Sequence, residues 1–301
     1  MFAVTFARYG DPSVLEVTEL PEPHAGPGQV RIAVRTAAVN PFDCKVRAGY
    51  MKDFVPIDFP SVPGLEAAGV VDEVGEGVTG VSVGDQVFGL GRATWAQYAV
   101  LDHVAAKPAV LGWPEVGGLA VAAETAQRSL DALGAGPGQT LLIDGAAGGV
   151  GSAAAQFARA AGLTVIGTAS EANHAYLRTL GVLPTLYGSG LAGRVAELAP
   201  NGVDLALDTA GKGSVPDLVA ITGSPDAVLS IADFNAGRHG VRTTSQASAF
   251  GALAKAASLA EAGEFTLRVD SVYPLEGAAR AHQRSESGHP AGKVVLSVRE
   301  E

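Results

Sequence analysis

The chain has 301 residues, of which 47% are hydrophobic, and its formal net charge is −10 at pH 7. This length suffices for two domains of ordinary size, each with a buried core. The negative charge, without clusters of lysine and arginine, argues against nucleic acid as a partner. The single cysteine, Cys44, excludes an intrachain disulfide and any four-cysteine metal site, which fits a reducing compartment.

Signals for secretion or membrane insertion are not recognisable in the sequence. The first residues lack the basic start, the apolar run and the small-residue cleavage site of a secretion signal. The longest apolar stretches, such as residues 116–123, are bounded by glutamates and fall well short of the roughly 20 residues that a membrane span requires. We therefore expect a cytoplasmic protein without a membrane partner.

The first part of the chain, up to about residue 110, contains short runs of alternating apolar residues between clusters of glycine and proline. Such runs are typical of an antiparallel β domain that is rich in turns. The strands predicted here are residues 30–34, 68–74, 85–88 and 95–100.

Beyond residue 120 the pattern changes to short apolar strands that alternate with helical segments. Alternation of this kind requires crossover connections and predicts a doubly wound parallel sheet. The predicted strands are residues 140–143, 163–167, 185–187, 204–207 and 228–231.

Four elements are predicted in the last part of the chain: a helix over residues 247–262, a strand over 267–272, a helix over 275–287 and a strand over 293–298. The two strands either extend the parallel sheet or return to the first domain. The pattern by itself leaves both topologies open.

A glycine turn joins the predicted strand over 140–143 to a helix predicted over 150–161, with the spacing Ala146-x-Gly148-x-x-Gly151. Without a Cβ, Gly148 lets a pyrophosphate approach the backbone, and Gly151 lets the helix pack closely on the strand. The N-terminus of the helix presents unpaired N–H groups that suit an anion. An ordinary turn in a chain with 39 glycines is the alternative. The context of strand, turn, helix and strand favours a dinucleotide-binding unit.

Three segments of the β domain precede this turn: NPFDCKVRAGY at residues 40–50, PGLEAAGVV at 63–71 and VGDQVFG at 83–89. Their order and spacing, together with the turn, resemble the medium-chain dehydrogenase/reductase superfamily, specifically its zinc-free quinone oxidoreductase branch. The resemblance covers nearly the whole chain.

This resemblance implies an α/β fold of two domains. A GroES-like antiparallel β domain, which carries the substrate and catalytic residues, is expected over residues 1–118 and 268–301. A Rossmann-type domain with a doubly wound parallel sheet is expected over residues 119–267. In that superfamily the last strands of the chain rejoin the first domain.

Two departures from the zinc-dependent relatives bear on metal binding. Those enzymes place a cysteine ligand at the position of Asn40 and have Gly-His-Glu where this chain has Gly64-Leu65-Glu66. A leucine cannot coordinate zinc, and with Cys44 alone the four-cysteine loop of a structural zinc site is missing. We therefore expect chemistry without a metal. Cys44 is expected to be a packed apolar residue rather than a nucleophile.

The predicted strand over 163–167 continues into Thr168-Ala169-Ser170, with no carboxylate at its tip. In NAD-binding folds an Asp or Glu at this place accepts hydrogen bonds from the adenosine ribose, and its charge repels a 2′-phosphate. NADPH is therefore favoured over NADH, whose use as a second coenzyme the sequence leaves open. Ser170 is a donor for the phosphate, and the resemblance places Tyr187 beside the same group.

The turn, the strand ends and the resemblance together predict the residues that bind the cofactor. Thr125 matches a helix position that contacts the nicotinamide in relatives, and the alternative is a helix threonine that bonds a carbonyl one turn back. Lys293 follows a family pattern that reaches the cofactor phosphates, or it is an ordinary lysine at the edge of a strand. The predicted cofactor-binding residues are Asn40, Thr125, Ala147, Gly148, Gly149, Val150, Thr168, Ala169, Ser170, Tyr187, Ile231 and Lys293.

A bound nicotinamide supplies a hydride, and the protein must position it and stabilise the negative charge that develops on the acceptor oxygen. Without a metal, hydrogen-bond donors must meet that charge. Asn40 and Tyr50 lie in the motif that lines the nicotinamide end in the resembling family, and they are the predicted catalytic residues. Tyr50 is also a candidate proton source, although a phenol with a pKa of about 10 is a slow acid. Asp43 is expected to orient this loop by accepting backbone N–H bonds.

The sequence thus predicts an NADPH-dependent, zinc-independent reductase of quinones or α,β-unsaturated carbonyl compounds. Two other functions stay open: an enoyl or polyketide-type reductase on the same scaffold, and an NADPH-binding redox sensor with little turnover. The expected partner is a small-molecule quinone or enone. Many relatives are homodimers through sheet edges, and this oligomeric state is compatible with the sequence but not required by it.

Overall fold

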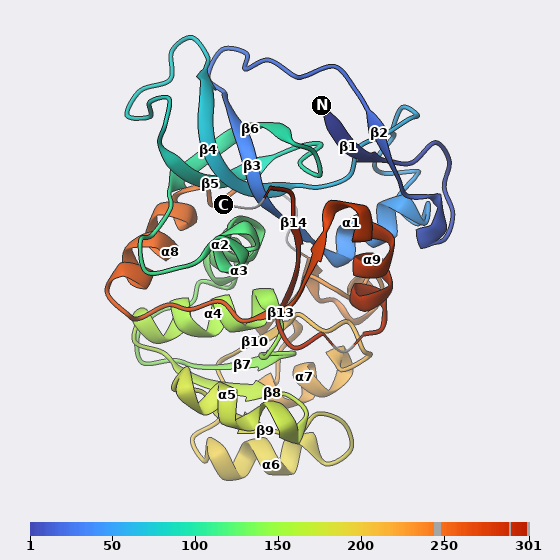
Figure 1. Cartoon of the computed structure of the whole chain (residues 1–301). Helices are drawn as coiled ribbons and strands as arrows, with labels where there is room; N and C mark the ends of the chain where they lie inside the picture. The colour runs from blue at the N-terminus through green and yellow to red at the C-terminus, as the bar shows by residue number, and fades with distance from the viewer. Residues whose placement is uncertain (244–247, 289, 300–301) are drawn as a thin grey trace. The chain divides into compact units, whose positions relative to one another are not determined.

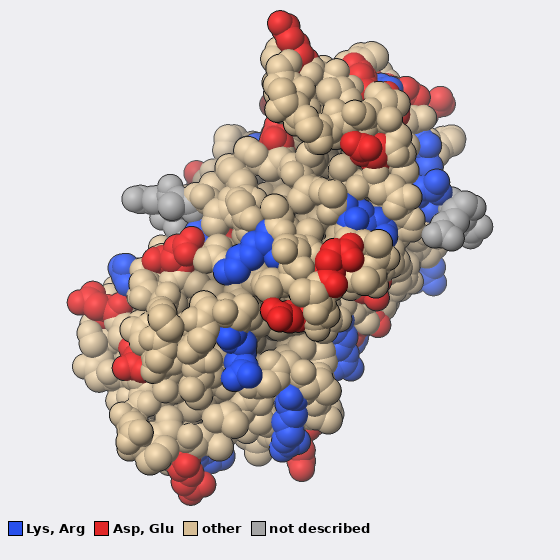
Figure 2. Space-filling view, turned by 90° about the vertical axis from the view of Figure 1, so that its left-hand side faces the viewer, with Lys and Arg blue, Asp and Glu red and all other residues tan. Residues whose placement is uncertain are grey.

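The computed structural model of the chain describes residues 1–243, 248–288 and 290–299. None of the helices within these residues combines the length and the apolar character needed to cross a membrane. On the face seen in Figure 2, the side chains of Lys and Arg are scattered among those of Asp and Glu and do not gather into one basic surface. This distribution is in keeping with the net charge of −10.

The chain divides into two compact units. Unit 1 comprises Met1–Val121 together with Leu253–Glu301, and unit 2 comprises Ala122–Ala252. Unit 2 is thus one continuous stretch of chain, and unit 1 is formed by the stretches on either side of it. The sequence predicts residues 253–267 to be part of the dinucleotide-binding domain. In the structure they belong to unit 1.

Unit 1 contains the strands β1 (Phe2–Thr5), β2 (Glu16–Glu19), β3 (Val30–Val39), β4 (Glu66–Val74), β5 (Gln86–Gly91), β6 (Tyr98–Ala106), β13 (Val269–Pro274) and β14 (Lys293–Ser297). β1 and β2 form a separate antiparallel pair. The others form a sheet in the order β13-β14-β3-β4-β5-β6 (Figure 1). Neighbours in this sheet are antiparallel except for β13 and β14. β3 also pairs with β6, so that β3, β4, β5 and β6 close into a small barrel.

The last two strands therefore return to the first domain instead of extending the parallel sheet. The central position of β3 follows from its sequence, in which Val30, Ile32 and Val34 are buried and alternate with partly exposed residues. Side chains of a strand point to opposite faces in turn, so one face of β3 covers the core of the barrel.

The predicted strand over residues 95–100 is shifted in the structure, because β6 begins only at Tyr98. Trp95 lies before it and is fully buried. Its indole Nε1 donates to Ala38 O at 3.0 Å, and its backbone N–H donates to Pro63 O at 3.2 Å. Its carbonyl oxygen accepts the N–H of Val4, in β1, at 2.9 Å. Trp95 is therefore held by packing and by bonds other than the strand pairing of the six-stranded sheet.

Unit 2 contains the strands β7 (Thr140–Asp144), β8 (Thr164–Thr168), β9 (Leu183–Thr185), β10 (Leu205–Asp208), β11 (Val228–Ser230) and β12 (Arg242–Thr243). They form one sheet in the order β12-β11-β10-β7-β8-β9, and all neighbours are parallel. With β7 counted as the first strand, the order read from β9 is 3-2-1-4-5-6, which is that of the doubly wound dinucleotide-binding fold. In such a sheet ligands bind at the carboxyl ends of the strands where the order reverses, here between β7 and β10.

Two strands of this sheet differ from the sequence-based expectation. The strand predicted over 185–187 is displaced by two residues, because β9 comprises Leu183–Thr185, so Tyr187 follows the strand instead of ending it. β12 has only two residues, Arg242 and Thr243, and is not predicted from the sequence. Such a strand is too short to show a periodic pattern.

The helices of unit 2 include α4 (Gly149–Ala160), α5 (His174–Thr179), α6 (Leu191–Leu198) and α7 (Val215–Thr222). α4 packs on β7 and β8, and the alanines at residues 153–155 are fully buried, which allows a close approach of helix and sheet. α6 contributes Leu191 and Val195 to a core that includes Leu142 of β7 and Ile166 of β8. Helices therefore cover the sheet of this unit and bury the apolar side chains of its strands.

Unit 1 also contains α1 (Pro41–Arg47), α2 (Trp113–Gly117) and α9 (Ala278–Glu286). Two helices cross the division between the units: α3 (Leu119–Leu133) and α8 (Gly251–Glu261). α8 corresponds to the helix predicted over 247–262, of which residue 247 lies outside the described residues.

Candidate functional site

The turn between β7 and α4 in unit 2 has the backbone conformation that its glycines allow. Gly145 has a φ of +80°, in the left-handed region that favours glycine. Gly148 is the N-cap of α4, and its N–H donates to Gly145 O at 3.0 Å. The helix then begins at Gly149, and the N–H groups of its first turn have no partner within the helix.

Gly148 and Gly151 differ in the contacts that a Cβ would make at each position. A Cβ at Gly151 would lie 2.9 Å from Ala146 Cα and closer still to Gly145 O, so the packing of α4 on the turn requires glycine. A Cβ at Gly148 would meet only Gly145 O, at 3.4 Å, which is an ordinary contact. The packing of the chain itself therefore does not require glycine at position 148. Its missing side chain leaves room beside the N-terminus of α4.

Asp144, the last residue of β7, is buried and binds the end of the neighbouring strand. Its carboxylate accepts hydrogen bonds from Thr168 Oγ1 and, at 2.6 Å, from Ser214 Oγ. Thr168 Oγ1 in turn accepts Gly145 N–H at 3.1 Å. The hydroxyl of Thr168, a predicted cofactor residue, is thus engaged within unit 2, where it ties the end of β8 to the glycine turn.

Asp208 ends β10, the neighbour of β7, and is also buried. Its carboxylate accepts the N–H groups of Ala210 at 2.9 Å and Gly211 at 2.8 Å, and the hydroxyl of Ser230 at 2.7 Å. Together with Asp144 it shapes the two strand ends at which the sheet order reverses. Neither aspartate is among the residues predicted from the sequence, although an acidic residue directly after a buried apolar run is a signal for them.

The other predicted cofactor residues of unit 2 follow the carboxyl ends of parallel strands and therefore lie along one edge of the sheet. Ala169 is buried, and its N–H donates to Thr185 O at 3.0 Å, which joins the ends of β8 and β9. Ser170 Oγ accepts from Asn173 Nδ2 at 3.1 Å. Tyr187 is 57% exposed. The set is completed by Ala147, Gly149 and Val150 at the glycine turn and by Ile231 directly after β11.

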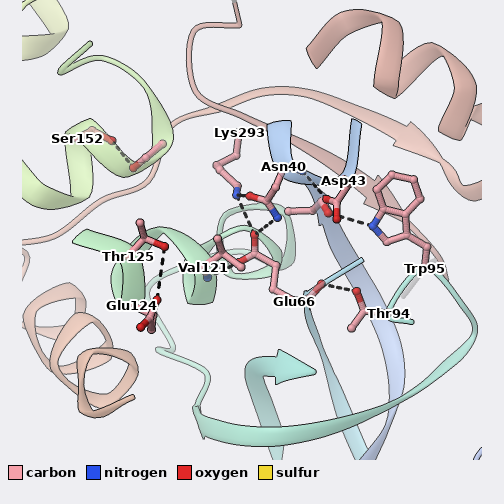
Figure 3. A network of polar contacts seen from close by, with 12 residues as sticks. Asn40, Asp43, Glu66, Thr94, Trp95, Val121, Glu124, Thr125, Ser152 and Lys293 are labelled. Carbon is pink, nitrogen blue, oxygen red and sulfur yellow. Dashed lines mark hydrogen bonds and ion pairs between the residues drawn. The ribbon is translucent and has the colours of Figure 1, made fainter. Parts of the chain in front are cut away.

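In unit 1, the side chains of Asn40, Glu66 and Lys293 form a buried polar network (Figure 3). Lys293 Nζ donates to Glu66 Oε1 at 2.8 Å and to Asn40 Oδ1 at 2.6 Å. Asn40 Nδ2 donates to Glu66 Oε1 at 3.0 Å. The second carboxylate oxygen of Glu66 accepts the N–H of Val121, in the first turn of α3, at 2.8 Å. Glu66 is 0% exposed and Lys293 is 6% exposed, so this ion pair is held away from water.

The register of the sheet explains why these three residues meet. β3 ends directly before Asn40 and lies between β4 and β14. Both neighbours run antiparallel to β3, so their first residues, Glu66 and Lys293, come to lie beside its end. A Cβ at Gly118 would lie 2.8 Å from Lys293 Cε, so this glycine makes room for the lysine side chain.

Asp43 orients the backbone at Asn40, as expected from the sequence. Asn40 is the N-cap of α1, and its N–H donates to Asp43 Oδ2 at 2.7 Å. Burial raises the pKa of the Asp43 carboxyl to about 7, and the nearby charge of Glu66 adds to this effect. The hydrogen bond from Asn40 and the charge of Lys293 act in the opposite direction. Asp43 therefore gains and loses its proton near neutral pH.

Two predicted residues of the nicotinamide end take no part in this network. Tyr50 follows α1 and is 78% exposed. Thr125 belongs to unit 2 and lies on α3, where its hydroxyl is 3.5 Å from Glu124 Oε2. Within unit 1, the structure thus brings Asn40 and Lys293 into contact, with Glu66 as a third member that is not among the site residues predicted from the sequence.

Cys44 belongs to the buried core of unit 1, and burial raises the pKa of its thiol to about 12. It is therefore a packed apolar residue at neutral pH. α9 packs against α1 and carries His282, which is fully buried and lies edge-to-face on Trp95 with ring centroids 4.9 Å apart. Burial, with a contribution from the charge of Arg47, lowers the pKa of His282 to about 3.

Two protein-family models match the chain: the alcohol dehydrogenase GroES-like domain over residues 26–130 and the zinc-binding dehydrogenase over residues 187–296. The second description refers to zinc. In the part of the chain that the structure describes, no group of three or more His, Cys, Asp or Glu side chains is placed to hold a metal ion.

Several known proteins resemble nearly the whole chain. It is 31% identical to 2-methylene-furan-3-one reductase of Solanum lycopersicum, over 98% of this chain and 79% of that relative. The quinone oxidoreductase from Coxiella burnetii has a TM-score of 0.83 at 28% identity, and 99% of each chain is covered. A mycobacterial protein solved as a complex with NADPH has a TM-score of 0.82 at 27% identity, over 99% of this chain and 100% of that chain.

A partial match points to the same scaffold. The chain is 41% identical to the polyketide synthase GfsB of Streptomyces halstedii over 60% of its own length, but it spans only 3% of that synthase. All these findings indicate the same family: the two family models, the parallel sheet with its glycine turn, and the relatives that match nearly the whole chain. The chain belongs to the medium-chain dehydrogenase/reductase superfamily of oxidoreductases, in its quinone oxidoreductase branch.

Proposed function

We propose that this protein is an NADPH-dependent oxidoreductase that transfers a hydride to a quinone or an α,β-unsaturated carbonyl compound without the help of a metal. The observation that carries the proposal is Gly148. On a sheet with the dinucleotide-binding strand order, this residue keeps a side chain away from the N-terminus of α4, where no contact within the chain demands glycine. A pyrophosphate that must approach the backbone closely accounts for this choice.

The coenzyme would be held by groups along the carboxyl edge of the sheet in unit 2. The N–H groups of Ala147, Gly149 and Val150 would bind the pyrophosphate, because the first turn of a helix presents unpaired donors and a partial positive charge. The N–H of Gly148 already bonds to Gly145 O, and Gly148 would contribute the room for the approach. Thr168 keeps this turn in shape, and Ile231 and Thr125 are proposed as further coenzyme contacts. When bound, the nicotinamide would supply the hydride.

The adenosine end of the site supports NADPH rather than NADH. β8 leads into the buried Ala169, so no carboxylate at this position would repel a 2′-phosphate. Ser170 and Tyr187, which follow the neighbouring strands β8 and β9, offer hydroxyl groups as donors. The neighbour that was solved with NADPH, at 27% identity, is consistent with this coenzyme.

In unit 1, we assign Asn40 as the donor to the acceptor oxygen on which negative charge develops. Asn40 Nδ2 carries two hydrogens, and its bond to Glu66 uses one of them. Lys293 gives two of its three ammonium hydrogens to Glu66 and Asn40, which leaves the third for an oxygen of the coenzyme. Tyr50 would act from its more exposed position as a second donor or, through a water, as the proton source.

An enoyl-type reductase on the same scaffold is the second candidate. It is favoured by the 41% identity to GfsB over 60% of this chain. Both reactions deliver a hydride to a conjugated carbonyl compound and develop charge on its oxygen, so the same donors serve both. The two candidates differ in the acceptor, which is a free quinone or enone in one case and an acyl thioester in the other.

The proposal is tested by titrating the purified protein with NADPH and NADH and then following NADPH absorbance with quinones, small enones and an enoyl thioester. We expect tighter binding of NADPH and steady oxidation by at least one quinone or enone. Turnover with the thioester alone would favour the second candidate, and binding without turnover on any acceptor would indicate a redox sensor. If neither coenzyme binds, or if turnover requires stoichiometric zinc, the proposal is wrong.

Three variants sharpen this test. In Gly148→Ala the fold tolerates the new methyl group, but the group occupies the proposed approach of the pyrophosphate, so the Kd for NADPH should rise at least about tenfold, or about 1.4 kcal/mol. Gly193→Ala is the matched control, because a Cβ there meets nothing within 4 Å. Ala169→Asp should weaken NADPH more than NADH. An unchanged ratio of the two affinities would refute the assignment of the 2′-phosphate site.

A further inference from the structure

Arg194 on α6 binds the loop that follows β9 through main-chain oxygens. Its Nη1 donates to Ser189 O at 2.8 Å. Its Nη2 lies 2.9 Å from Leu186 O, 3.2 Å from Gly188 O and 3.4 Å from Tyr187 O. One guanidinium group thus gathers the carbonyl oxygens of four consecutive residues.

The backbone of the loop and the helix beneath it are suited to this arrangement. Gly188 and Gly190 have φ values of +81° and +78°, in the region that favours glycine. A Cβ at Gly190 would lie 2.9 Å from Arg194 Nη1. α6 is anchored, because Leu191 and Val195 are buried in the core of unit 2. Residues 186–190 are themselves exposed, so the arginine rather than side-chain packing determines the course of the loop.

The loop carries Tyr187 to the edge of the sheet at which β8 ends. Thr185 O, two residues before Tyr187, accepts Ala169 N–H at 3.0 Å. The loop therefore leaves the sheet beside Ala169 and Ser170. Under the proposed function, Ser170 and Tyr187 bind the 2′-phosphate of NADPH.

We propose that Arg194 is a positioning residue for coenzyme selectivity: by holding the carbonyl oxygens of residues 186–189, it determines where the Tyr187 phenol stands and thereby the preference for a 2′-phosphate. This inference rests on the proposed function and adds to it a residue that acts through another one. A guanidinium suits this role because its N–H donors lie in one fixed plane on three nitrogens and can reach several acceptors. The three N–H donors of a lysine ammonium all lie on one nitrogen.

The experiment measures the Kd values of NADPH and NADH for the whole chain and its variants. In Arg194→Met we expect the Kd for NADPH to rise about tenfold, or about 1.4 kcal/mol. The Kd for NADH should stay within about twofold, which corresponds to about 0.4 kcal/mol. Arg194→Lys keeps the charge but loses the fork, so it should lose selectivity as well. If the Met variant fails to fold, the Lys variant decides, with its NADH affinity and thermal midpoint as controls of folding.

A double variant separates positioning from an effect of charge or stability. If Arg194 acts through Tyr187, the change Arg194→Met adds little to the loss already caused by Tyr187→Ala, because the effects of coupled residues are not additive. Additive losses, or an Arg194→Lys variant with the full preference for NADPH, would overturn the inference. A wild-type protein that binds NADPH no more tightly than NADH would instead overturn the coenzyme assignment on which it rests.

Discussion

Replacing Lys293 by methionine tests how far the buried ion pair with Glu66 stabilises unit 1. Methionine keeps most of the apolar stem of the lysine side chain and removes the ammonium. The change deletes the hydrogen bonds of 2.8 Å to Glu66 and 2.6 Å to Asn40. It leaves a carboxylate with 0% exposure without its opposite charge.

The expected loss follows from what remains around Glu66. Removing one partner of a buried ion pair costs about 3–5 kcal/mol, because the other charge stays out of water. Glu66 keeps N–H donors from Asn40 and Val121, so we expect the lower end, about 3 kcal/mol. The double change Lys293→Met with Glu66→Gln leaves no charge unpaired and should recover about 2 kcal/mol of this loss.

Urea unfolding followed by tryptophan fluorescence reports on the relevant unit. The two tryptophans of the chain, Trp95 and Trp113, both lie in unit 1. Lys52→Met, at an exposed position, is the matched control. It should change the free energy of unfolding by less than about 0.5 kcal/mol. A loss below about 1 kcal/mol for Lys293→Met, or strictly additive effects of the two single changes, would refute the reasoning, since a coupled buried pair has neither property.

Three further predictions concern buried groups. Because burial lowers the pKa of His282 to about 3 from an ordinary value of 6.5, His282 contributes a loss of stability of about 1.4 kcal/mol for each unit by which the pH falls between these values. Asp43 contributes with the opposite sign between pH 3.8 and 7, because burial raises the pKa of its carboxyl to about 7 and the folded state holds the proton more tightly. The two contributions offset each other in the wild type, so each is measured as the difference between a variant and the wild type in urea unfolding at pH 4.5 and 7.5. Relative to the wild type, His282→Phe, which keeps a ring against Trp95, should be more stable at pH 4.5 than at pH 7.5, and Asp43→Asn should be more stable at pH 7.5 than at pH 4.5; a difference that does not change with pH would contradict the assignment of that residue. Gly151→Ala places a methyl group against Gly145 O and should destabilise the protein by about 1–3 kcal/mol through overpacking, seen as a lower thermal midpoint by circular dichroism; an unchanged midpoint would mean that α4 moves away without cost.

The fold of unit 2 is predictable from sequence because its signals are local. Its strands are short apolar runs, and the run at residues 140–143 differs from β7 only by the final Asp144. The glycine turn needs nothing beyond its own few residues. Errors occur where the local signal is short, as in the two residues of β12, or where a strand is displaced along the chain, as β9 is to Leu183–Thr185.

The candidate site is predictable only in part, because its contacts join distant positions. Asn40 and Lys293 are each predicted through the family resemblance, but their contact is not, because it joins residues 253 positions apart through the register of β3 and β14. No periodic pattern records such a register. The contacts of Arg194 are still harder to predict from the sequence, because its acceptors are main-chain oxygens, which every residue type carries.

The discontinuity of unit 1 has a consequence for the order in which a ribosome completes the two halves. Unit 2 emerges as one uninterrupted stretch, Ala122–Ala252, and all of its strand partners are present once that stretch has left the exit tunnel. On the side of β3 that faces β14, residues 36–39 pair with residues 294–297, which are synthesised only after unit 2. Until then this side of β3 is an unpaired strand edge, which can pair incorrectly with other nascent chains. Vectorial synthesis therefore completes unit 2 before this edge of β3 in unit 1 is covered.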